Sequence, residues 1–181
     1  MACPSARLLF CSSSSVYGGQ GGEAVTEASP CLAVAPGARL LQEGERFVLS
    51  QGGTVARLVP LYGGGRCELL RRFVQREPAL AGHAERILDY VHVADAASAL
   101  MCLASTGVAE VVNVCGESFS KAEVYGALSA LTGLPAPEEA AEQGRRGLSD
   151  QRVSAARLRS LGWQPQTDFV GWAAAHWQQM N

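Results

Sequence analysis

The chain has 181 residues, a formal net charge of −2, and 48% hydrophobic against 18% charged residues, which fits one globular domain with a core of its own. This small net charge gives no reason to expect nucleic acid or a membrane surface as a partner. No apolar run approaches the length that crosses a bilayer, and the first residues lack the apolar stretch of a secretory signal, so we expect a cytoplasmic protein, with an organelle as the alternative location.

The first predicted element is a buried strand over residues 7–12, which is followed by a serine cluster and a glycine-rich loop. Next comes a helix over 38–50, which has apolar side chains on one face and ends before two glycines. The residues expected to face inward are Leu40, Leu41, Phe47 and Val48, and those expected to face outward are Glu43 and Glu45.

Further strands are predicted over 54–62, 86–93 and 110–116, and the first of these is apolar enough to be buried in a parallel sheet. The remaining predicted helices cover 67–77, 96–105, 121–133, 155–162 and 169–179. Their expected N-caps are Asp95, Ser120 in a capping box with Glu123, and Ser154. Strands that alternate with helices indicate an α/β fold.

The cysteines form no Cys-x-x-Cys pair, and most of them lie in apolar runs. This pattern predicts small buried thiols in a reducing compartment rather than a disulfide framework. The six are Cys3, Cys11, Cys31, Cys67, Cys102 and Cys115.

Five segments carry a recognisable order of motifs: LLFCSSSSVYG (8–18), TVARLVPLYGGGR (54–66), ILDYVHVADAASAL (87–100), VVNVCGESFSKAEV (111–124) and RVSAARLRSLGWQPQ (152–166). In this order they resemble the second half of the extended short-chain dehydrogenases/reductases, the NAD(P)-dependent epimerase/dehydratase family. The resemblance implies that residues 1–181 are the C-terminal part of a Rossmann-type parallel sheet, without its N-terminal strands, and a small substrate-binding lobe. It also implies NAD or NADP as the cofactor and a small, sugar-like molecule as the substrate.

Two features of that family have no counterpart in the sequence. One is the Gly-x-x-Gly-x-x-Gly turn that holds the cofactor pyrophosphate at a helix N-terminus; the glycines within 18–22 lead into a polar loop instead. The other is the Tyr-x-x-x-Lys pair, in which the lysine lowers the tyrosine pKa; the matching positions hold Gly37 and Leu41. We therefore expect a truncated form that binds the cofactor poorly and does not transfer hydride by itself.

Lys121 is the only lysine, and none of the four tyrosines is followed by it at the required spacing. Lys121 and Tyr125 have the reverse order, on a helix far along the chain. This pair predicts an ordinary exposed helix turn.

Several candidate site residues follow from the resemblance. Ser13 matches the serine that contacts the substrate oxygen, although no activated acid or base lies beside it in the sequence. The candidates for cofactor contacts are Ser12, Arg39, Pro60 and Leu61, and those for substrate contacts are Ser14, Tyr17 and Arg66. Each has a structural alternative, because serine hydroxyls can satisfy backbone groups and the arginines can be solvated. Pro60 replaces an asparagine that contacts phosphate in the family's nucleotide-sugar epimerases, which argues against a nucleotide-sugar substrate.

Asp89, His92 and Asp95 are spaced three apart, but they straddle a strand end and a helix start, so we expect no metal site. Three functions stay open. The chain is an inactive part of an epimerase/dehydratase domain, or an interaction module whose open sheet edge pairs with a second copy, another chain or an N-terminal half, or a small enzyme that uses the serine cluster.

Overall fold

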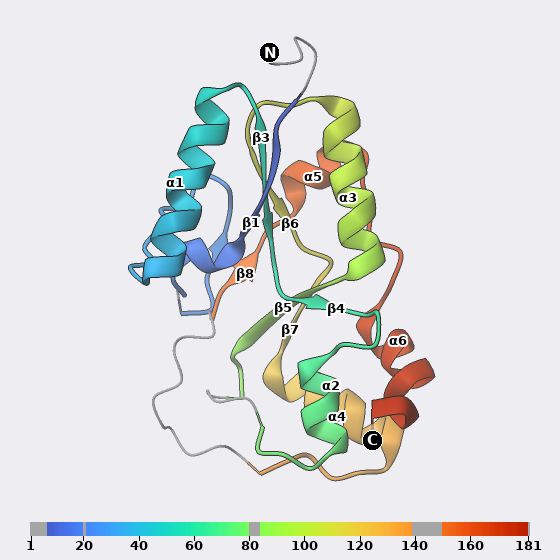
Figure 1. Ribbon diagram of the computed structural model, residues 1–181. Helices are drawn as coiled ribbons and strands as arrows, with labels where there is room; N and C mark the ends of the chain where they lie inside the picture. The colour runs from blue at the N-terminus through green and yellow to red at the C-terminus, as the bar shows by residue number, and fades with distance from the viewer. Residues whose placement is uncertain (1–6, 20, 80–83, 139–149, 181) are drawn as a thin grey trace.

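The computed structural model describes residues 7–19, 21–79, 84–138 and 150–180. Its centre is a parallel sheet of β1 (Leu9–Ser13), β3 (Thr54–Leu58) and β6 (Val111–Val114), in the order β1-β3-β6. Helix α1 (Pro36–Ser50) covers one face of this sheet and α3 (Val93–Thr106) covers the other, as Figure 1 shows. The predicted α/β fold with a parallel sheet is confirmed.

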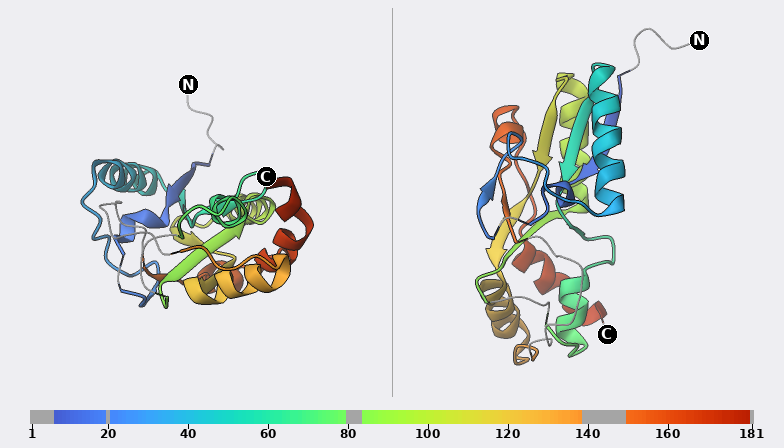
Figure 2. Two further views of the ribbon diagram at one scale, coloured as in Figure 1. Left: turned by 90° about the horizontal axis from the view of Figure 1, so that it is seen from below. Right: turned by 90° about the vertical axis from the view of Figure 1, so that its left-hand side faces the viewer.

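A second lobe lies beyond the carboxyl ends of these strands (Figures 1 and 2). It contains a sheet in the order β4-β5-β7, made of β4 (Leu61–Tyr62), β5 (Ile87–His92) and β7 (Glu117–Ser120). Its helices are α2 (Glu68–Val74), α4 (Lys121–Thr132), α6 (Phe169–His176) and the 3-10 helix η2 (Trp177–Met180). Aromatic rings fill its core: the Tyr62 ring centroid lies 5.2 Å from that of Phe169 and 5.1 Å from that of Trp172.

A small parallel ladder joins the loop after β1 to the C-terminal part of the chain. β2 (Ala24–Val25) pairs with β8 (Arg152–Val153), and α5 (Ala156–Ser160) follows β8. The loop starts at Gly18, which follows the 3-10 helix η1 (Ser14–Tyr17) and has a φ of 86°. A Cβ at this glycine would lie 2.8 Å from the Ala33 nitrogen, so the close approach of two backbone segments requires glycine here.

The predicted strand over 54–62 is two strands in different sheets. β3 ends at Leu58 and β4 begins at Leu61, with Pro60, which has no backbone N–H to donate, between them. The short strand β7, three residues after β6, was not predicted.

Strand β1 is less buried than its sequence predicts. Leu9 and Phe10 are half-buried and Cys11 is exposed. Among the described residues β1 pairs only with β3, so its outer edge is open. Within the same part of the chain no helix is both long and apolar enough to cross a membrane.

The predicted orientation of α1 is wrong at three positions: two residues expected inside are exposed, and one expected outside is buried. Leu40 and Phe47 are 68% and 63% exposed, whereas Glu45 is only 4% exposed. The buried stripe instead runs through Ala38, Glu45 and Val48. An apolar pattern could not place Glu45, because the reason for its burial lies in another strand.

One of the predicted caps occurs: Ser120 and Glu123 form the expected capping box. Ser154 is not the N-cap of α5, which is Ala155 without a side-chain cap, although Ser154 Oγ accepts the Ala156 amide at 3.3 Å. Asp95 does not cap α3; the helix starts at Val93 and its N-cap is His92, whose Nδ1 accepts the Ala94 amide.

Lys121 and Tyr125 are 4% and 5% exposed, so the predicted exposed turn is wrong and α4 packs this face inward. The five cysteines that the structure describes are free. Cys67 and Cys115 are buried as predicted, but Cys11 is exposed; Cys3 lies outside the described residues.

Candidate functional site

The serine cluster lies where β1 ends and passes into η1. Ser13 pairs in register with Leu58, so the serines and the residues after β3 share one end of the sheet. Ligands of α/β proteins bind at the carboxyl ends of parallel strands. The sequence therefore places Ser13, Pro60 and Leu61 at the edge of the sheet where a site is expected.

The serines of this cluster take part in local structure, Ser13 through its hydroxyl and Ser14 through its carbonyl. Ser13 Oγ accepts the Ser15 amide at 3.2 Å and caps η1. Ser14 is 3% exposed, and its carbonyl accepts a hydrogen bond from Gln151 Nε2 at 3.1 Å. The contacts in the structure are those of the structural alternative, and the substrate roles of Ser13 and Ser14 stay predictions.

A buried ion pair underlies the site. Arg57 of β3 donates from Nε and Nη2 to the two carboxylate oxygens of Glu45 in α1, at 2.9 and 2.6 Å. Ser12 Oγ donates to the same carboxylate at 2.6 Å. The Arg57 and Glu45 side chains are 6% and 5% exposed, so α1 is held to the sheet by a desolvated, bidentate charge pair.

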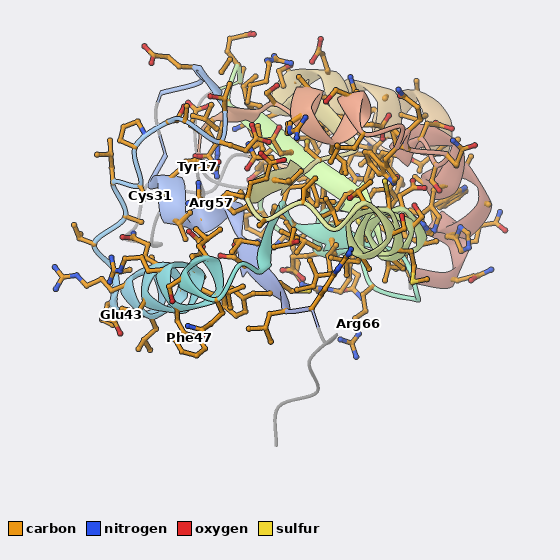
Figure 3. All side chains as sticks on the ribbon, turned by 90° about the horizontal axis from the view of Figure 1, so that it is seen from above. Tyr17, Cys31, Glu43, Phe47, Arg57 and Arg66 are labelled. Carbon is orange, nitrogen blue, oxygen red and sulfur yellow. The ribbon has the colours of Figure 1, made fainter. Side chains whose placement is uncertain are left out.

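Tyr17 completes this cluster from η1. The Arg57 guanidinium lies 4.8 Å from the centroid of its ring, and Figure 3 shows Tyr17, Arg57 and Cys31 side by side above α1. The Tyr17 hydroxyl donates to Asn113 Oδ1 at 2.7 Å, and Asn113 Nδ2 donates to the Ser154 carbonyl at 3.2 Å. This chain of contacts connects β1, β3, β6 and the residue after β8.

The electrostatics of the cluster fit a structural role. Burial raises the pKa of Tyr17, and the nearby Arg57 offsets this only in part. Burial alone would lower the pKa of Arg57, but hydrogen bonds to Glu45 and Tyr17 raise it. Burial also raises the pKa of Tyr62 and Tyr90. None of these three phenols is activated for proton transfer near neutral pH.

The positions that match the family's tyrosine and lysine lie on α1, about two turns and one turn before Glu45, respectively. Gly37 is exposed, and a Cβ built on it would meet nothing within 4 Å. Leu41 is half-buried and packs against the main core. The residues that would exchange a proton are thus replaced by open space and an aliphatic side chain.

The other candidates do not converge on the cluster. Arg39, Pro60 and Arg66 are exposed, and Leu61 is 50% exposed. Arg66 closes a tight turn with Gly63 and lies well away from Tyr17 and Arg57 in Figure 3. Their contacts with a cofactor or substrate stay predictions.

Asp89, His92 and Asp95 perform three separate tasks. Asp89 accepts hydrogen bonds from Ser118 Oγ and the Val153 amide, and His92 caps α3. Asp95 accepts the amides of Gln166 and Thr167, each at 3.0 Å. Across the described residues no group of three His, Cys, Asp or Glu side chains could hold a metal ion.

Sequence reasoning missed the buried polar residues that organise this region: Glu45, Arg57, Asn113 and Gln151. One signal was available for Arg57, which is a charged residue inside an apolar strand. An arginine there needs a buried acidic partner, and a glutamate on the preceding helix can supply it.

A parallel α/β sheet with helices on both faces, and with polar side chains gathered where its strands end, defines this molecule as part of a Rossmann-type domain. The profile of the NAD dependent epimerase/dehydratase family matches residues 1–115. The chain belongs to this family.

Solved structures agree. MoeE5 in complex with UDP-glucose and NAD is 26% identical, with a TM-score of 0.78 over 96% of this chain and 64% of its own. UDP-glucuronic acid 4-epimerase from Bacillus cereus, in complex with NAD, is 18% identical, with a TM-score of 0.77 over 95% of this chain and 60% of its own. The dTDP-glucose 4,6-dehydratase of Bacillus anthracis, in complex with NAD, is 21% identical, with a TM-score of 0.77 over 97% of this chain and 64% of its own. This chain therefore spans less than two thirds of these structures. No curated protein matches it.

The residues present do not fit an NAD site of this family. The glycines at 18, 19, 21 and 22 have positive φ angles, but β2 follows them rather than a helix whose N-terminus could face a pyrophosphate. The ribose and proton-transfer contacts expected from α1 are replaced by Gly37 and Leu41. No catalytic step through NAD can be assigned to this chain.

Proposed function

We propose that residues 1–181 form the C-terminal part of an atypical epimerase/dehydratase domain, and that this chain alone does not transfer hydride. The observation that carries the proposal is the empty space at Gly37, with Leu41 one turn further along α1. A phenol and an ammonium group are needed there, and no described residue near the serines replaces them. The tyrosine of the cluster, Tyr17, donates to Asn113 and has a raised pKa.

A completed domain would act on a small, sugar-like molecule with NAD or NADP. The support is the family, together with structural neighbours that bind NAD and nucleotide sugars such as UDP-glucose. In this chain the serine loop would line the substrate side, with Ser13, Ser14 and Tyr17 nearest. Pro60, in place of an asparagine, favours a sugar-like substrate without the nucleotide.

Calorimetry with NAD and NADP tests this proposal, together with an assay for nicotinamide reduction over a panel of sugars. We expect no saturable binding tighter than about 1 mM, which corresponds to roughly −4 kcal/mol, and no reduction. The matched variant is Gly37→Tyr/Leu41→Lys, which restores the pair on α1. It should stay inactive, because the described residues form no phosphate cradle. Binding of either dinucleotide near 1 µM, or turnover by the unaltered chain, would overturn the proposal.

A second candidate function is association through the outer edge of β1. In the described part of the chain this edge has no partner strand, and Cys11 at its centre is exposed. The neighbouring apolar side chains Leu8 and Phe47 are 44% and 63% exposed. An unpaired edge beside apolar surface favours pairing with a further strand, supplied by a second copy, another chain or an N-terminal half.

Sedimentation velocity over a range of concentrations tests this second function. We expect the chain to self-associate, and Cys11→Lys, which places a charge on the edge, to weaken association at least tenfold. Met101→Lys is the control, because Met101 is 72% exposed on α3, on the other face of the sheet. A chain that stays monomeric at every concentration would refute pairing with a second copy, and equal effects of the two variants would refute the edge of β1 as the contact.

A further inference from the structure

A pocket lies on the side of the molecule opposite the open edge of β1. It is lined by residues of β2, β7, β8 and α5 and by the turn after β6. In the main sheet, β6 is the strand at the far end from β1. Its volume is about 590 Å³, which is within the range of small-molecule sites. None of the candidate residues around Ser13, Gly37 or Pro60 lines it, so it is separate from the site described above.

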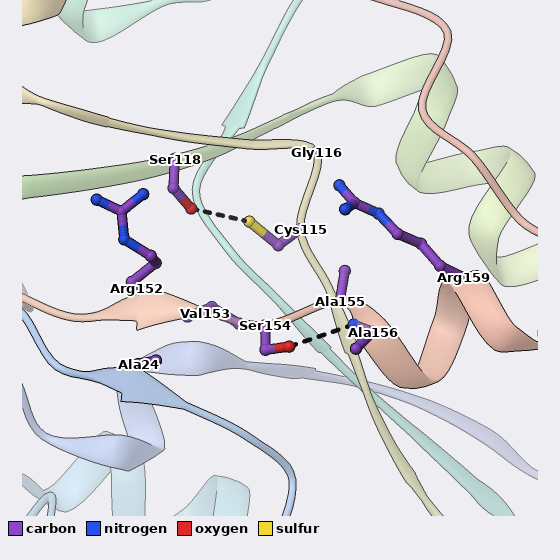
Figure 4. Close-up of a pocket in the computed structure, with 10 residues that line it drawn as sticks. All are labelled: Ala24, Cys115, Gly116, Ser118, Arg152, Val153, Ser154, Ala155, Ala156 and Arg159. Carbon is purple, nitrogen blue, oxygen red and sulfur yellow. Dashed lines mark hydrogen bonds between the residues drawn. The ribbon is translucent and has the colours of Figure 1, made fainter.

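Two arginines stand on either side of this pocket. Figure 4 shows Arg152 of β8 and Arg159 of α5 flanking it, with Ser118 and Cys115 between them. Both arginines are exposed, and neither forms an ion pair with a described residue. Arg157, two residues before Arg159, is different because it is paired with Glu110 at 2.5 Å.

The remaining lining determines what can enter. Ser154 Oγ accepts the Ala156 amide, and its hydroxyl hydrogen has no acceptor among the described residues, so it can donate to a ligand. The exposed alanines Ala24 and Ala156 supply apolar surface, whereas Val153 and Ala155 are buried in the core beneath the pocket. Among the described residues no carboxylate lines the pocket. Asp89 is buried behind Ser118, and Arg152 lies close enough to Glu123 to help lower the pKa of that carboxyl.

We propose that this pocket binds a small phosphate monoester, with its phosphate between Arg152 and Arg159 and its organic part against the alanine-lined wall. Two guanidinium groups and a hydroxyl offer more donors than one carboxylate can accept, whereas a phosphate has three terminal oxygens and nearly two charges. The volume exceeds what free phosphate needs, and this favours an ester. The site does not depend on the proposed function, because it needs neither NAD nor the edge of β1.

Calorimetry on the purified chain at low salt tests the proposal with ribose 5-phosphate, ribose and inorganic phosphate as probes. Ribose 5-phosphate should bind saturably and should lose affinity as salt is raised. Ribose should not bind, and inorganic phosphate should bind at least threefold more weakly than the ester. If inorganic phosphate binds equally well, the ester is refuted as the ligand class.

Three variants locate the binding. Arg152→Gln/Arg159→Gln should weaken ribose 5-phosphate binding at least tenfold, whereas Arg157→Gln, on the same short helix, should leave it within twofold. Ala156→Phe fills the pocket and keeps both arginines, so it should also weaken binding tenfold; far-ultraviolet circular dichroism checks that it folds. The proposal is overturned if the unaltered chain does not bind, if Arg157→Gln matches the double variant, or if folded Ala156→Phe binds normally.

Discussion

Removing the charge of Glu45 tests whether the buried pair with Arg57 holds α1 on the sheet. Glu45→Gln leaves one acceptor oxygen in place of a carboxylate that receives two hydrogen bonds from Arg57 and one from Ser12. The arginine would stay buried without a counter-charge. Breaking such a pair costs about 3–5 kcal/mol, which lowers the melting temperature of a chain of this size by roughly 6–20 °C.

Urea unfolding followed by circular dichroism measures this cost, and an exposed pair supplies the control. Glu110 bonds Arg157 with the side chains 39% and 42% exposed, so Glu110→Gln should cost only about 0–1 kcal/mol. The double variant Glu45→Leu/Arg57→Leu removes both charges and should be less destabilised than Glu45→Gln. If Glu45→Gln and Glu110→Gln cost the same to within about 1 kcal/mol, the pair does not hold the helix.

Three further outcomes are expected. Burial raises the pKa of Asp89 to about 6, so the folded state binds a proton more tightly than the unfolded state does. The free energy of unfolding should therefore fall as the pH rises from about 4 to about 6. Asp89→Asn should flatten this part of the pH profile. Ser120→Ala removes the capping box of α4 and should lower the free energy of unfolding in urea by about 1 kcal/mol. Unchanged stability would contradict this prediction. Gly18→Ala should lower the free energy of unfolding more than Gly52→Ala does in the same assay. Both glycines have a positive φ, but of the two only Gly18 would place a Cβ within 3 Å of other backbone. Equal losses would show that the loop backbone moves to accommodate the methyl group.

The order of strands and helices could be predicted because it depends on local patterns. Apolar runs of five or six residues, glycines after periodic segments and the Ser120–Glu123 pair each act within a few residues. The capping box and the stop at Gly133 occur where the sequence placed them. Strand boundaries failed at Pro60, where one apolar run serves two sheets.

Long-range polar contacts could not be predicted in the same way. Asp95 looks like an N-cap, but its carboxylate accepts amides 71 and 72 residues further along the chain. Glu45 looks like a surface residue until Arg57 is placed beside it. The exposure of Cys11 depends on which strand pairs with β1, and the strand's own sequence does not contain this information.

A single stripe on one side of helix α1 carries both a residue that stabilises the fold and the two positions that match the family's catalytic residues. Gly37, Leu41 and Glu45 are four residues apart, so they share one side of the helix. At Glu45 the stripe is anchored to β3 through Arg57, whereas at Gly37 it opens into space. The anchor does not require a tyrosine or a lysine above it, and the sheet, both covering helices and the serine loop are all present without them. A family fold in this chain is therefore no evidence of the family's reaction, which has to be judged from the residues on that stripe.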